Sequence, residues 1–258
     1  MIKIGIAGAF GRMGQAIAAL VEQEKEMKLA LALEAKGSGF AGKNICGCIV
    51  TDDLKKGSDG IDVLIDFTTP SATVENIKIL AGTGKAAVIG TTGLDDNEMY
   101  EIKNAASRIP VVYASNYSVG VNVMWKIIRD AVSAMKADYD IDIVESHHRM
   151  KKDAPSGTAV TTAQVILGEK GLDYASNVVF GREGRENERP RNQLGVLAVR
   201  GGGVIGEHTV ILASMADKLE VKHTSFSRDT FAAGALKAAA FIKDKKPGLY
   251  SMKDVLGI

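Results

Sequence analysis

Apolar runs and helical patterns alternate along the first part of the chain. Short apolar runs of strand length cover residues 2–7, 27–33, 62–67, 86–89 and 111–114. Between them, polar and apolar positions repeat with the period of a helix over 11–24, 70–81 and 95–107. Strands that alternate with such helices need right-handed crossovers, so the pattern predicts a doubly wound parallel sheet covered by helices on both faces.

The second part of the chain has a different pattern of apolar and polar positions. Residues 139–145, YDIDIVE, alternate with period two, which is typical of a strand with one wet face. Further strands, which we expect to be antiparallel, are predicted at 196–199, 208–213 and 219–226. Helices are predicted over 121–135, 158–167 and 229–243. The polar segment 181–192 is expected to be a surface loop.

These two patterns of apolar and polar positions predict two domains. An α/β domain covers 1–118, and an α+β domain on an open mixed sheet covers 119–227. The periodicity leaves open whether the last helix returns to the first domain.

Charge and hydropathy exclude several classes of protein. The chain has 258 residues with 32 basic and 31 acidic side chains, so it lacks the basic surface of a nucleic-acid binder. No apolar run reaches the ~18 residues of a membrane helix, and the N-terminus MIKIGIAG does not resemble a signal peptide. We therefore expect a cytoplasmic protein with no membrane partner. Cys46 and Cys48 are too few ligands for a closed zinc site, and we expect small buried thiols or loop residues.

A glycine-rich turn, GAFGRMG, joins the first predicted strand to the first helix. Gly8, Gly11 and Gly14 lie where backbone N–H groups and the helix dipole favour a pyrophosphate. Glu34 ends the second predicted strand, where an acidic side chain would bind a ribose hydroxyl of a dinucleotide. Lys36 and Arg12 could instead bind the 2′-phosphate of NADP, so the cofactor preference stays open. The alternative is that the glycines serve only helix–strand packing.

Three hydroxyl-rich loops follow other predicted strands. They are FTTP, GTTG and ASNYS, at residues 67–70, 90–93 and 114–118. Each alone is an ordinary turn. Because the carboxyl ends of parallel strands line the ligand crevice of such a sheet, we expect the three to lie together there.

The segment ESHHRMKKDAPSGT, residues 145–158, holds half of the four histidines of the chain. His147 and His148 follow an alternating strand, so their side chains should diverge, which argues against a two-histidine metal site and we expect none. His147 and Lys151 are candidate proton donors. Ser156 is a candidate N-cap, and the N–H groups of Gly157 and Thr158 suit a carboxylate. The segment is thus suited to a small anionic substrate that receives a proton, and a solvated loop before a capped helix is the simpler alternative.

With these motifs the chain resembles the 4-hydroxy-tetrahydrodipicolinate reductase family, also called dihydrodipicolinate reductase, of bacterial lysine and diaminopimelate biosynthesis. The resemblance runs over nearly the whole chain. It is carried in order by GAFGRMG, DFTTP, GTTG, ASNYSVGVNV, ESHHRMKKDAPSGT, REG and GEHT. The histidine–lysine string is its most specific part.

The resemblance implies a Rossmann domain completed by the C-terminal segment 228–258, and a substrate domain over 119–227 whose open sheet builds a homotetramer. It implies hydride transfer from NADH or NADPH to a cyclic dicarboxylate. In this comparison His147 matches the proton donor and Lys151 a second one, while His148, Gly157 and Thr158 match substrate contacts.

The resemblance also implies a set of cofactor contacts. These are Gly8, Ala9, Phe10, Gly11, Arg12, Met13, Glu34, Lys36, Gly90, Thr91, Thr92, Ala114, Ser115, Asn116 and Tyr117. Many members carry a basic residue directly after the acidic one. Here Ala35 takes that place and Lys36 follows, which leaves the strength of NADPH binding open.

Two other functions fit part of the pattern. A dehydrogenase of aspartate or homoserine type shares a glycine turn and a two-domain plan, but not the histidine–lysine string. A regulatory protein that binds a dinucleotide without turning it over would give the histidine–lysine string no chemical role.

Overall fold

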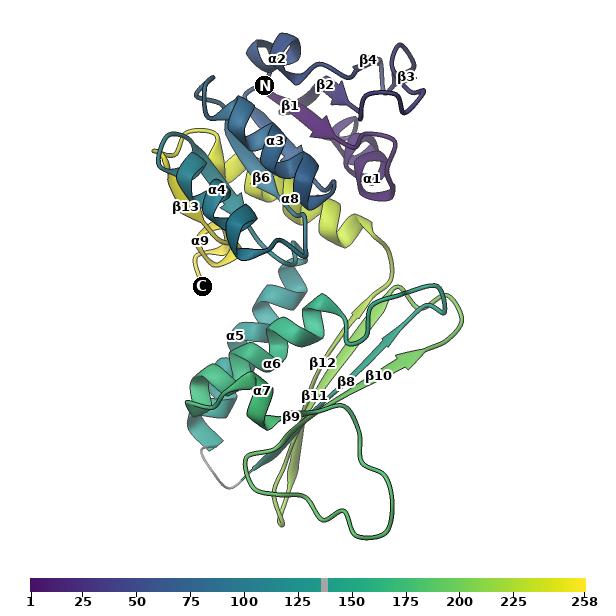
Figure 1. Ribbon diagram of the computed structural model, residues 1–258, viewed down its shortest axis with the longest axis vertical. Helices are drawn as coiled ribbons and strands as arrows, with labels where there is room; N and C mark the ends of the chain where they lie inside the picture. Colours follow the sequence, from purple (N-terminus) through teal and green to yellow (C-terminus); the bar gives the residue numbers. More distant parts are fainter. Residues whose placement is uncertain (136–138) are drawn as a thin grey trace. The chain divides into compact units, whose positions relative to one another are not determined.

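The structure is a computed structural model that describes residues 1–135 and 139–258. The chain divides into two compact units (Figure 1). The first is formed by Met1–Val119 together with Arg228–Ile258, and the second by Gly120–Ser227. The C-terminal segment therefore returns to the first unit, which the sequence pattern had left open.

The first unit contains a long, mostly parallel sheet with the strand order β13-β7-β6-β5-β1-β2-β4-β3. All its neighbouring strands are parallel except the β3–β4 pair. The strands are β1 (Ile2–Ala7), β2 (Met27–Leu33), β3 (Asn44–Ile45), β4 (Cys48–Thr51), β5 (Val63–Asp66), β6 (Ala86–Ile89), β7 (Pro110–Tyr113) and β13 (Gly248–Tyr250). The predicted doubly wound parallel sheet is confirmed.

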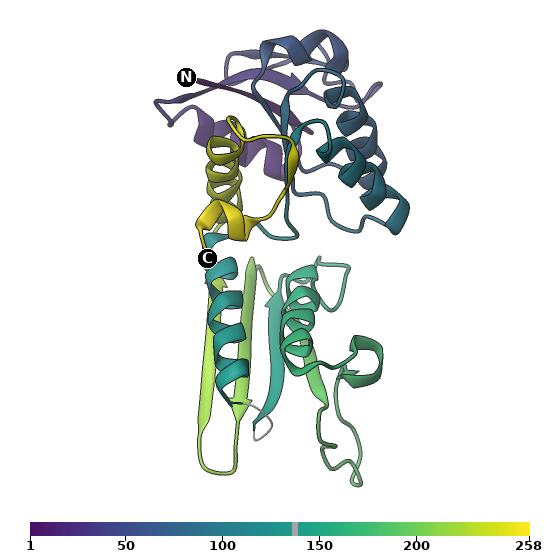
Figure 2. The same ribbon diagram turned by 90° about the vertical axis from the view of Figure 1, so that its left-hand side faces the viewer.

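Helices cover both faces of this sheet (Figure 2). One face packs on α1 (Arg12–Val21), α8 (Asp229–Ile242) and α9 (Met252–Leu256). The other packs on α2 (Leu54–Gly57), α3 (Pro70–Leu80) and α4 (Asp96–Ala106). A short 3₁₀ turn, Ser58–Gly60, follows α2. Because both faces are buried, the strands contain continuous apolar runs, which is why the sequence showed them clearly.

The strand order places a ligand crevice at the end of β1. β1 lies between β2 and β5, so the connections leave it in opposite directions along the sheet. In open α/β sheets this reversal opens a crevice at the carboxyl ends of the strands. The glycine turn begins there, at Gly8.

The second unit is built on a mixed sheet with the order β12-β11-β8-β10-β9. Its strands are β8 (Asp140–His147), β9 (Val178–Val179), β10 (Leu194–Arg200), β11 (Gly206–Ala213) and β12 (Lys218–Ser225). Its helices, α5 (Val119–Met135), α6 (Gly157–Lys170) and α7 (Tyr174–Asn177), lie on one side of the sheet in Figure 1. The predicted open mixed sheet is confirmed.

One predicted pairing was wrong. We expected the later strands to be antiparallel, but β10 pairs with β8 in parallel, whereas β11 and β12 are antiparallel as predicted. The connection from β8 to β10 runs through α6, and a helical crossover of this kind returns the chain in the same direction.

The covered face of this sheet is the face that carries the apolar positions of β8. Ile141 and Ile143 are buried against α5 and α6, while Val144 on the opposite face is half-buried. A hydrogen bond of 2.8 Å from Nε1 of Trp125 to Oγ1 of Thr162 joins the two helices. In the described part of the chain, no helix is both long and apolar enough to cross a membrane.

Candidate active site

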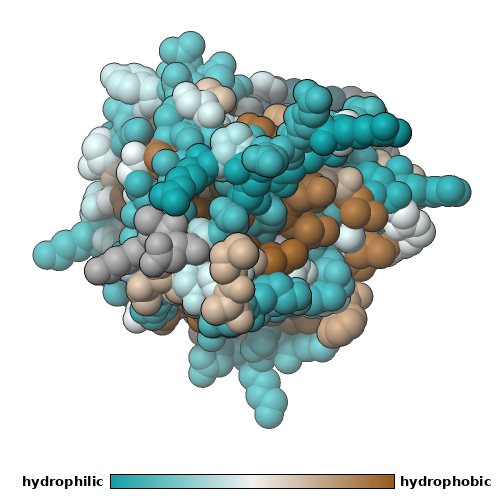
Figure 3. Space-filling model, turned by 90° about the horizontal axis from the view of Figure 1, so that it is seen from below, coloured by the Kyte–Doolittle hydropathy of each residue, from teal (hydrophilic) through white to brown (hydrophobic). Residues whose placement is uncertain are grey.

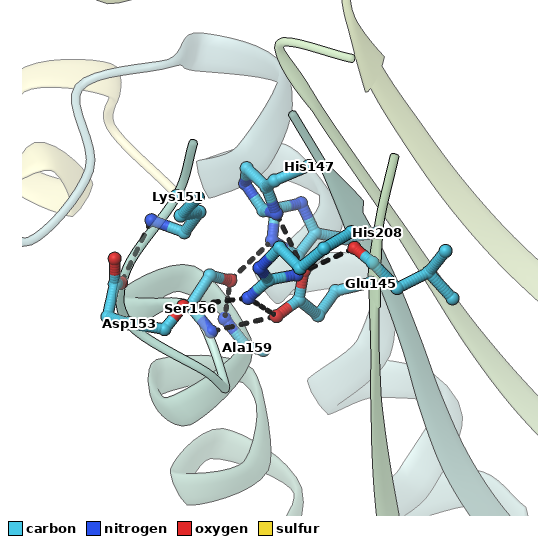
Figure 4. Close-up of polar contacts among 9 residues, drawn as sticks. Glu145, His147, Lys151, Asp153, Ser156, Ala159 and His208 are labelled. Carbon is cyan, nitrogen blue, oxygen red and sulfur yellow. Dashed lines mark hydrogen bonds and ion pairs between the residues drawn. The ribbon is translucent and has the colours of Figure 1, made fainter. Parts of the chain in front are cut away.

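The candidate chemistry of the second unit gathers at the end of β8 (Figure 4). Glu145 and His147 are two residues apart on a strand, so both side chains point to the same face. Both are buried, Glu145 completely. Nδ1 of His147 lies 2.6 Å from Oε2 of Glu145, which orients the imidazole ring.

Glu145 is held as a carboxylate. Arg200 of β10 donates from two nitrogens to its two oxygens at 2.7 and 2.8 Å, and the backbone N–H of Ser156 donates at 2.9 Å. Burial favours the neutral acid, but the hydrogen bonds from His147, Arg200 and Ser156 outweigh it and lower the pKa of Glu145 to about 2. The carboxylate is therefore charged at neutral pH.

A second buried histidine, His208 of β11, lies beside the first. The ring centroids of His147 and His208 are 5.2 Å apart, and Nε2 of His208 is 3.0 Å from Oγ of Ser156. Burial and the nearby charge of His147 lower the pKa of His208 to about 3. His208 is therefore neutral and serves as a packing and hydrogen-bonding partner.

The remaining candidates of the histidine–lysine segment lie on the loop after β8 and on the first turn of α6. The side chain of Lys151 is half-buried, and its Nζ lies 2.9 Å from Oδ2 of Asp153. His148 follows the last residue of β8 and is half-buried, whereas His147 is buried. Ser156 is the N-cap of α6 and accepts a hydrogen bond from the N–H of Ala159 at 3.2 Å, as predicted. Gly157 and Thr158 form the start of the helix.

The glycine turn in the first unit has the geometry of a phosphate cradle. A Cβ atom at Gly14 would lie 2.1 Å from the carbonyl oxygen of Gly8, so only glycine lets α1 start this close to β1. Gly11 is the N-cap of α1 and supplies no side-chain cap. N–H groups of the first helical turn have no intrahelical partner, so they are suited to an anion. These residues fit the pyrophosphate of a dinucleotide.

A cavity of about 580 Å³ opens beside this turn. Its lining includes Gly8, Glu34, Lys36, Thr68, Thr69 and Asn76. Oε1 of Glu34 accepts a hydrogen bond of 2.7 Å from the N–H of Phe10, so the acidic side chain is tied to the glycine turn. The volume lies within the range of small-ligand sites.

Several side chains of the other hydroxyl-rich loops are hydrogen-bonded or packed against other parts of the first unit. The hydroxyl of Thr91 is buried 2.7 Å from that of Thr73, and Gly90 packs against the ring of Phe67. Tyr117 is buried, with its hydroxyl 2.9 Å from the carbonyl oxygen of Ile89. At Thr91 and Tyr117, a contact with a cofactor would therefore have to come from the backbone.

Two family models together match nearly all of the chain. The model described as "Dihydrodipicolinate reductase, N-terminus" matches residues 2–117, and "Dihydrodipicolinate reductase, C-terminus" matches residues 120–256. The chain belongs to the dihydrodipicolinate reductase family.

Similar curated proteins agree with this membership in the dihydrodipicolinate reductase family. The chain is 43% identical to the 4-hydroxy-tetrahydrodipicolinate reductase of Geobacter metallireducens over 266 aligned positions, and all of both chains is covered. It is 41% identical to the enzyme of the same name from Citrifermentans bemidjiense, again over both whole chains.

Solved structures share the fold. A dipicolinate-bound dihydrodipicolinate reductase from Paenisporosarcina sp. TG-14 is similar, with a TM-score of 0.77, 24% identity and 98% of each chain covered. An aspartate dehydrogenase from Thermotoga maritima has a TM-score of 0.53 at 15% identity, over 95% of this chain and 98% of that one. The fold alone therefore does not separate the dihydrodipicolinate reductase family from other dehydrogenases.

Three residues of this reductase-family site were missed by reasoning from the sequence. The period-two pattern of β8 places Glu145 on the same face as His147 and could have revealed it. Arg200 and His208 come from β10 and β11, and only the strand register brings them to Glu145. No local signal marks that register.

Proposed function

We propose that this chain reduces (2S,4S)-4-hydroxy-2,3,4,5-tetrahydrodipicolinate to (S)-2,3,4,5-tetrahydrodipicolinate, with loss of water, in lysine and diaminopimelate biosynthesis. The observation that carries the proposal is the buried Glu145–His147 pair at the N-terminus of α6, with Lys151 on the loop between β8 and that helix. This arrangement suits a reaction in which an anionic substrate receives a proton.

NADH or NADPH would supply the hydride, bound in the first unit. The glycine turn at Gly8–Met13 would hold the pyrophosphate, and Glu34 would bind the adenosine ribose. Lys36 lines the same cavity and offers a positive charge to a 2′-phosphate. We expect the remaining contacts from the loops Gly90–Thr92 and Ala114–Tyr117, largely through the backbone.

His147 would deliver the proton. Its Nδ1 faces Glu145, which leaves Nε2 as the atom that exchanges a proton with the substrate. Lys151 would act as a second donor and offset the negative charge of the substrate.

The start of α6 would hold a carboxylate of the substrate. Gly157 and Thr158 occupy the first helical positions after Ser156, where backbone N–H groups and the helix dipole favour an anion. His148 would contact the substrate from the end of β8. Together these groups would orient the ring for hydride transfer.

A coupled assay tests the proposal. The protein is mixed with NADH or NADPH and with substrate made in place by the preceding synthase from pyruvate and aspartate semialdehyde. We expect loss of the reduced-nicotinamide absorbance only when every component is present. Turnover of aspartate or an oxo-dicarboxylate instead would support the aspartate-type alternative. Dinucleotide binding with no turnover of any dicarboxylate would support a regulatory protein.

Replacement of Lys151 by alanine tests the role of the second donor. We expect turnover to fall and the Michaelis constant for the substrate to rise, because both a proton donor and a positive charge are lost. Steady-state kinetics of Lys151→Ala against the unaltered chain measure both. Unchanged values of both constants would remove Lys151 from the site.

We also propose that copies of this chain assemble into a homotetramer in the cytoplasm through the open face of the second unit. That face carries apolar side chains on three neighbouring strands: Val144, Leu197, Val199 and Ile211. Val199 is 49% exposed. Figure 3 shows that hydrophobic side chains reach the surface together on the side of the molecule seen from below. A sheet face of this composition favours burial against another copy.

A further inference from the structure

Glu145 is surrounded by hydrogen-bond donors on both of its oxygens. Oε2 accepts from Nδ1 of His147 at 2.6 Å and from Arg200 at 2.7 Å. Oε1 accepts from the N–H of Ser156 at 2.9 Å and from Arg200 at 2.8 Å. The side chain is completely buried, so these protein groups replace water as its partners.

These partners determine where the hydrogen of His147 lies. The backbone N–H of Ser156 and the guanidinium of Arg200 can only donate, so both oxygens of Glu145 must accept. An ionised carboxylate has no hydrogen to give to an imidazole nitrogen. Nδ1 of His147 therefore carries a hydrogen, and Nε2 is the nitrogen that takes up and releases a proton.

Glu145 also joins two parts of the site that come from different elements. One oxygen holds the ring of His147 on β8, and the other holds Ser156, which caps α6 directly before Gly157 and Thr158. Arg200 bridges both oxygens and also donates to the carbonyl oxygen of Asp153 at 2.8 Å, in the loop between the two elements. One buried carboxylate thus connects the proton donor to the helix start.

We propose that Glu145 is a positioning residue that, together with Arg200, keeps His147 in the Nδ1–H tautomer and ties it to the Ser156–Thr158 turn. The inference rests on the proposed role of His147 as proton donor. In that step the proton leaves Nε2 of the doubly protonated ring and bonds to the reduced substrate. The neutral ring keeps the hydrogen on Nδ1, where it stays hydrogen-bonded to Glu145, and solvent returns a proton to Nε2. Glu145 itself stays ionised and touches no substrate.

The variant Glu145→Gln tests this assignment because its amide has only one acceptor oxygen. With the oxygen toward Ser156, the NH₂ group faces Nδ1 of His147 and one nitrogen of Arg200. With the opposite orientation, the NH₂ group faces two groups that can only donate. The first orientation is favoured, since His147 can relieve its contact by moving its hydrogen to Nε2. If the ring of His147 is doubly protonated, its Nδ1–H and the new amide NH₂ group at position 145 are two donors that face each other.

We expect Glu145→Gln to lower kcat on the order of 10²–10⁴-fold, as for other histidines held in the wrong tautomer. Michaelis constants for substrate and dinucleotide should stay within about threefold, since neither ligand touches Glu145. Nitrogen NMR of the imidazoles, practical because the chain has four histidines, should show His147 move from the Nδ1–H to the Nε2–H tautomer.

Two further variants keep the test informative if Glu145→Gln alone does not fold. The single variant Glu145→Gln leaves the guanidinium of Arg200 without its carboxylate partner, which destabilises the fold. The double variant Glu145→Gln with Arg200→Met removes both charges and should show the same change of tautomer. Asp142→Asn is the matched control. Asp142 lies on the same strand, is held by Arg189 at 2.7 Å and by the N–H of Gly195 at 2.8 Å, and faces away from His147. It should leave the tautomer and kcat unchanged.

An Nδ1–H tautomer retained in Glu145→Gln, with kcat within about twofold of the unaltered chain, would overturn the inference. The NMR result does not depend on the reaction. If the unaltered chain turns over no dicarboxylate, the proposed function fails, while a change of tautomer still supports the positioning role and its absence still contradicts it.

Discussion

At the scale of single residues, Gly206 leaves room for the ring of His147. A Cβ atom at Gly206 would lie 3.2 Å from Nε2 of His147, the nitrogen to which we assign proton transfer. That separation is shorter than an ordinary van der Waals contact, so the ring would have to shift.

The variant Gly206→Ala should therefore lower kcat, on the order of tenfold to a hundredfold, because a small displacement of a catalytic group is costly. Dinucleotide affinity should not change, since the cofactor site lies in the first unit. The control is Gly168→Ala within α6, where an added Cβ meets nothing within 4 Å. Steady-state kinetics and a binding titration measure both effects. Normal turnover in Gly206→Ala would mean that Nε2 does not need its present position.

The charge of Glu145 should also appear in the pH dependence of stability. Its pKa is about 2 in the folded protein, below the ordinary value of 4.5, so its contribution is complete above pH 4.5 and is lost as the pH falls toward 2. Between about pH 5 and pH 3 the free energy of unfolding should fall by about 2 kcal/mol more in the unaltered chain than in Glu145→Gln. Urea unfolding at each pH measures this difference. Parallel curves for the two proteins would contradict it.

Sequence reasoning could propose His147 and Lys151 as catalytic candidates because scarce residue types are close together in one segment. His147 and Lys151 stand four positions apart, so no folded structure was needed to associate them. Arg200 is 55 residues from Glu145 along the chain and reaches it only through the pairing of β10 with β8. An interaction of that kind depends on strand register, which composition does not encode.

At the scale of elements, the close approach of α1 to β1 depends on Gly14. The 2.1 Å separation from the oxygen of Gly8 leaves no room for a side chain, and the atom in the way is backbone. The turn and the helix start would have to move apart together.

We therefore expect Gly14→Ala to weaken dinucleotide binding by at least tenfold and to destabilise the first unit, because the phosphate cradle depends on this spacing. Gly60→Ala is the control, since an added Cβ there meets nothing within 4 Å. Fluorescence titration with NADH and thermal unfolding measure the two effects. Undiminished binding in Gly14→Ala would mean that the turn does not hold the cofactor.

The strands buried on both faces were predictable, and the short, partly exposed elements were not. The buried strands of the first unit contain continuous apolar runs, so β1, β2, β5, β6 and β7 were all found. β3, β9 and α7 have two to four residues each, too few to show a period. The direction of β10 was missed because alternation gives the buried face of a strand but not its neighbours.

At the scale of the whole molecule, the open face of the second unit is the surface that we propose for self-association. Ile211 lies among its apolar side chains on β11, between β8 and β12. A charge placed there would be buried without a partner if copies of the chain meet on this face.

The variant Ile211→Lys should therefore dissociate the proposed homotetramer. Light scattering should give about four times the 27.3 kDa chain mass for the unaltered protein and a lower mass for the variant. The control is Tyr100→Lys, a similar change at a residue of the first unit that is 68% exposed. An unchanged mass in Ile211→Lys would move the interface elsewhere.

Family membership is established, as is the fold of the described residues, while the role of His147 as proton donor is proposed. The most direct measurement compares turnover and dinucleotide affinity of His147→Ala with those of the unaltered chain in the coupled reductase assay. We predict that turnover falls on the order of 10²–10⁴-fold while dinucleotide affinity stays within about twofold, because the ring acts in proton transfer and belongs to the second unit, whereas the dinucleotide is proposed to bind in the first. Near-normal turnover in His147→Ala would contradict this role and remove His147 from the chemistry.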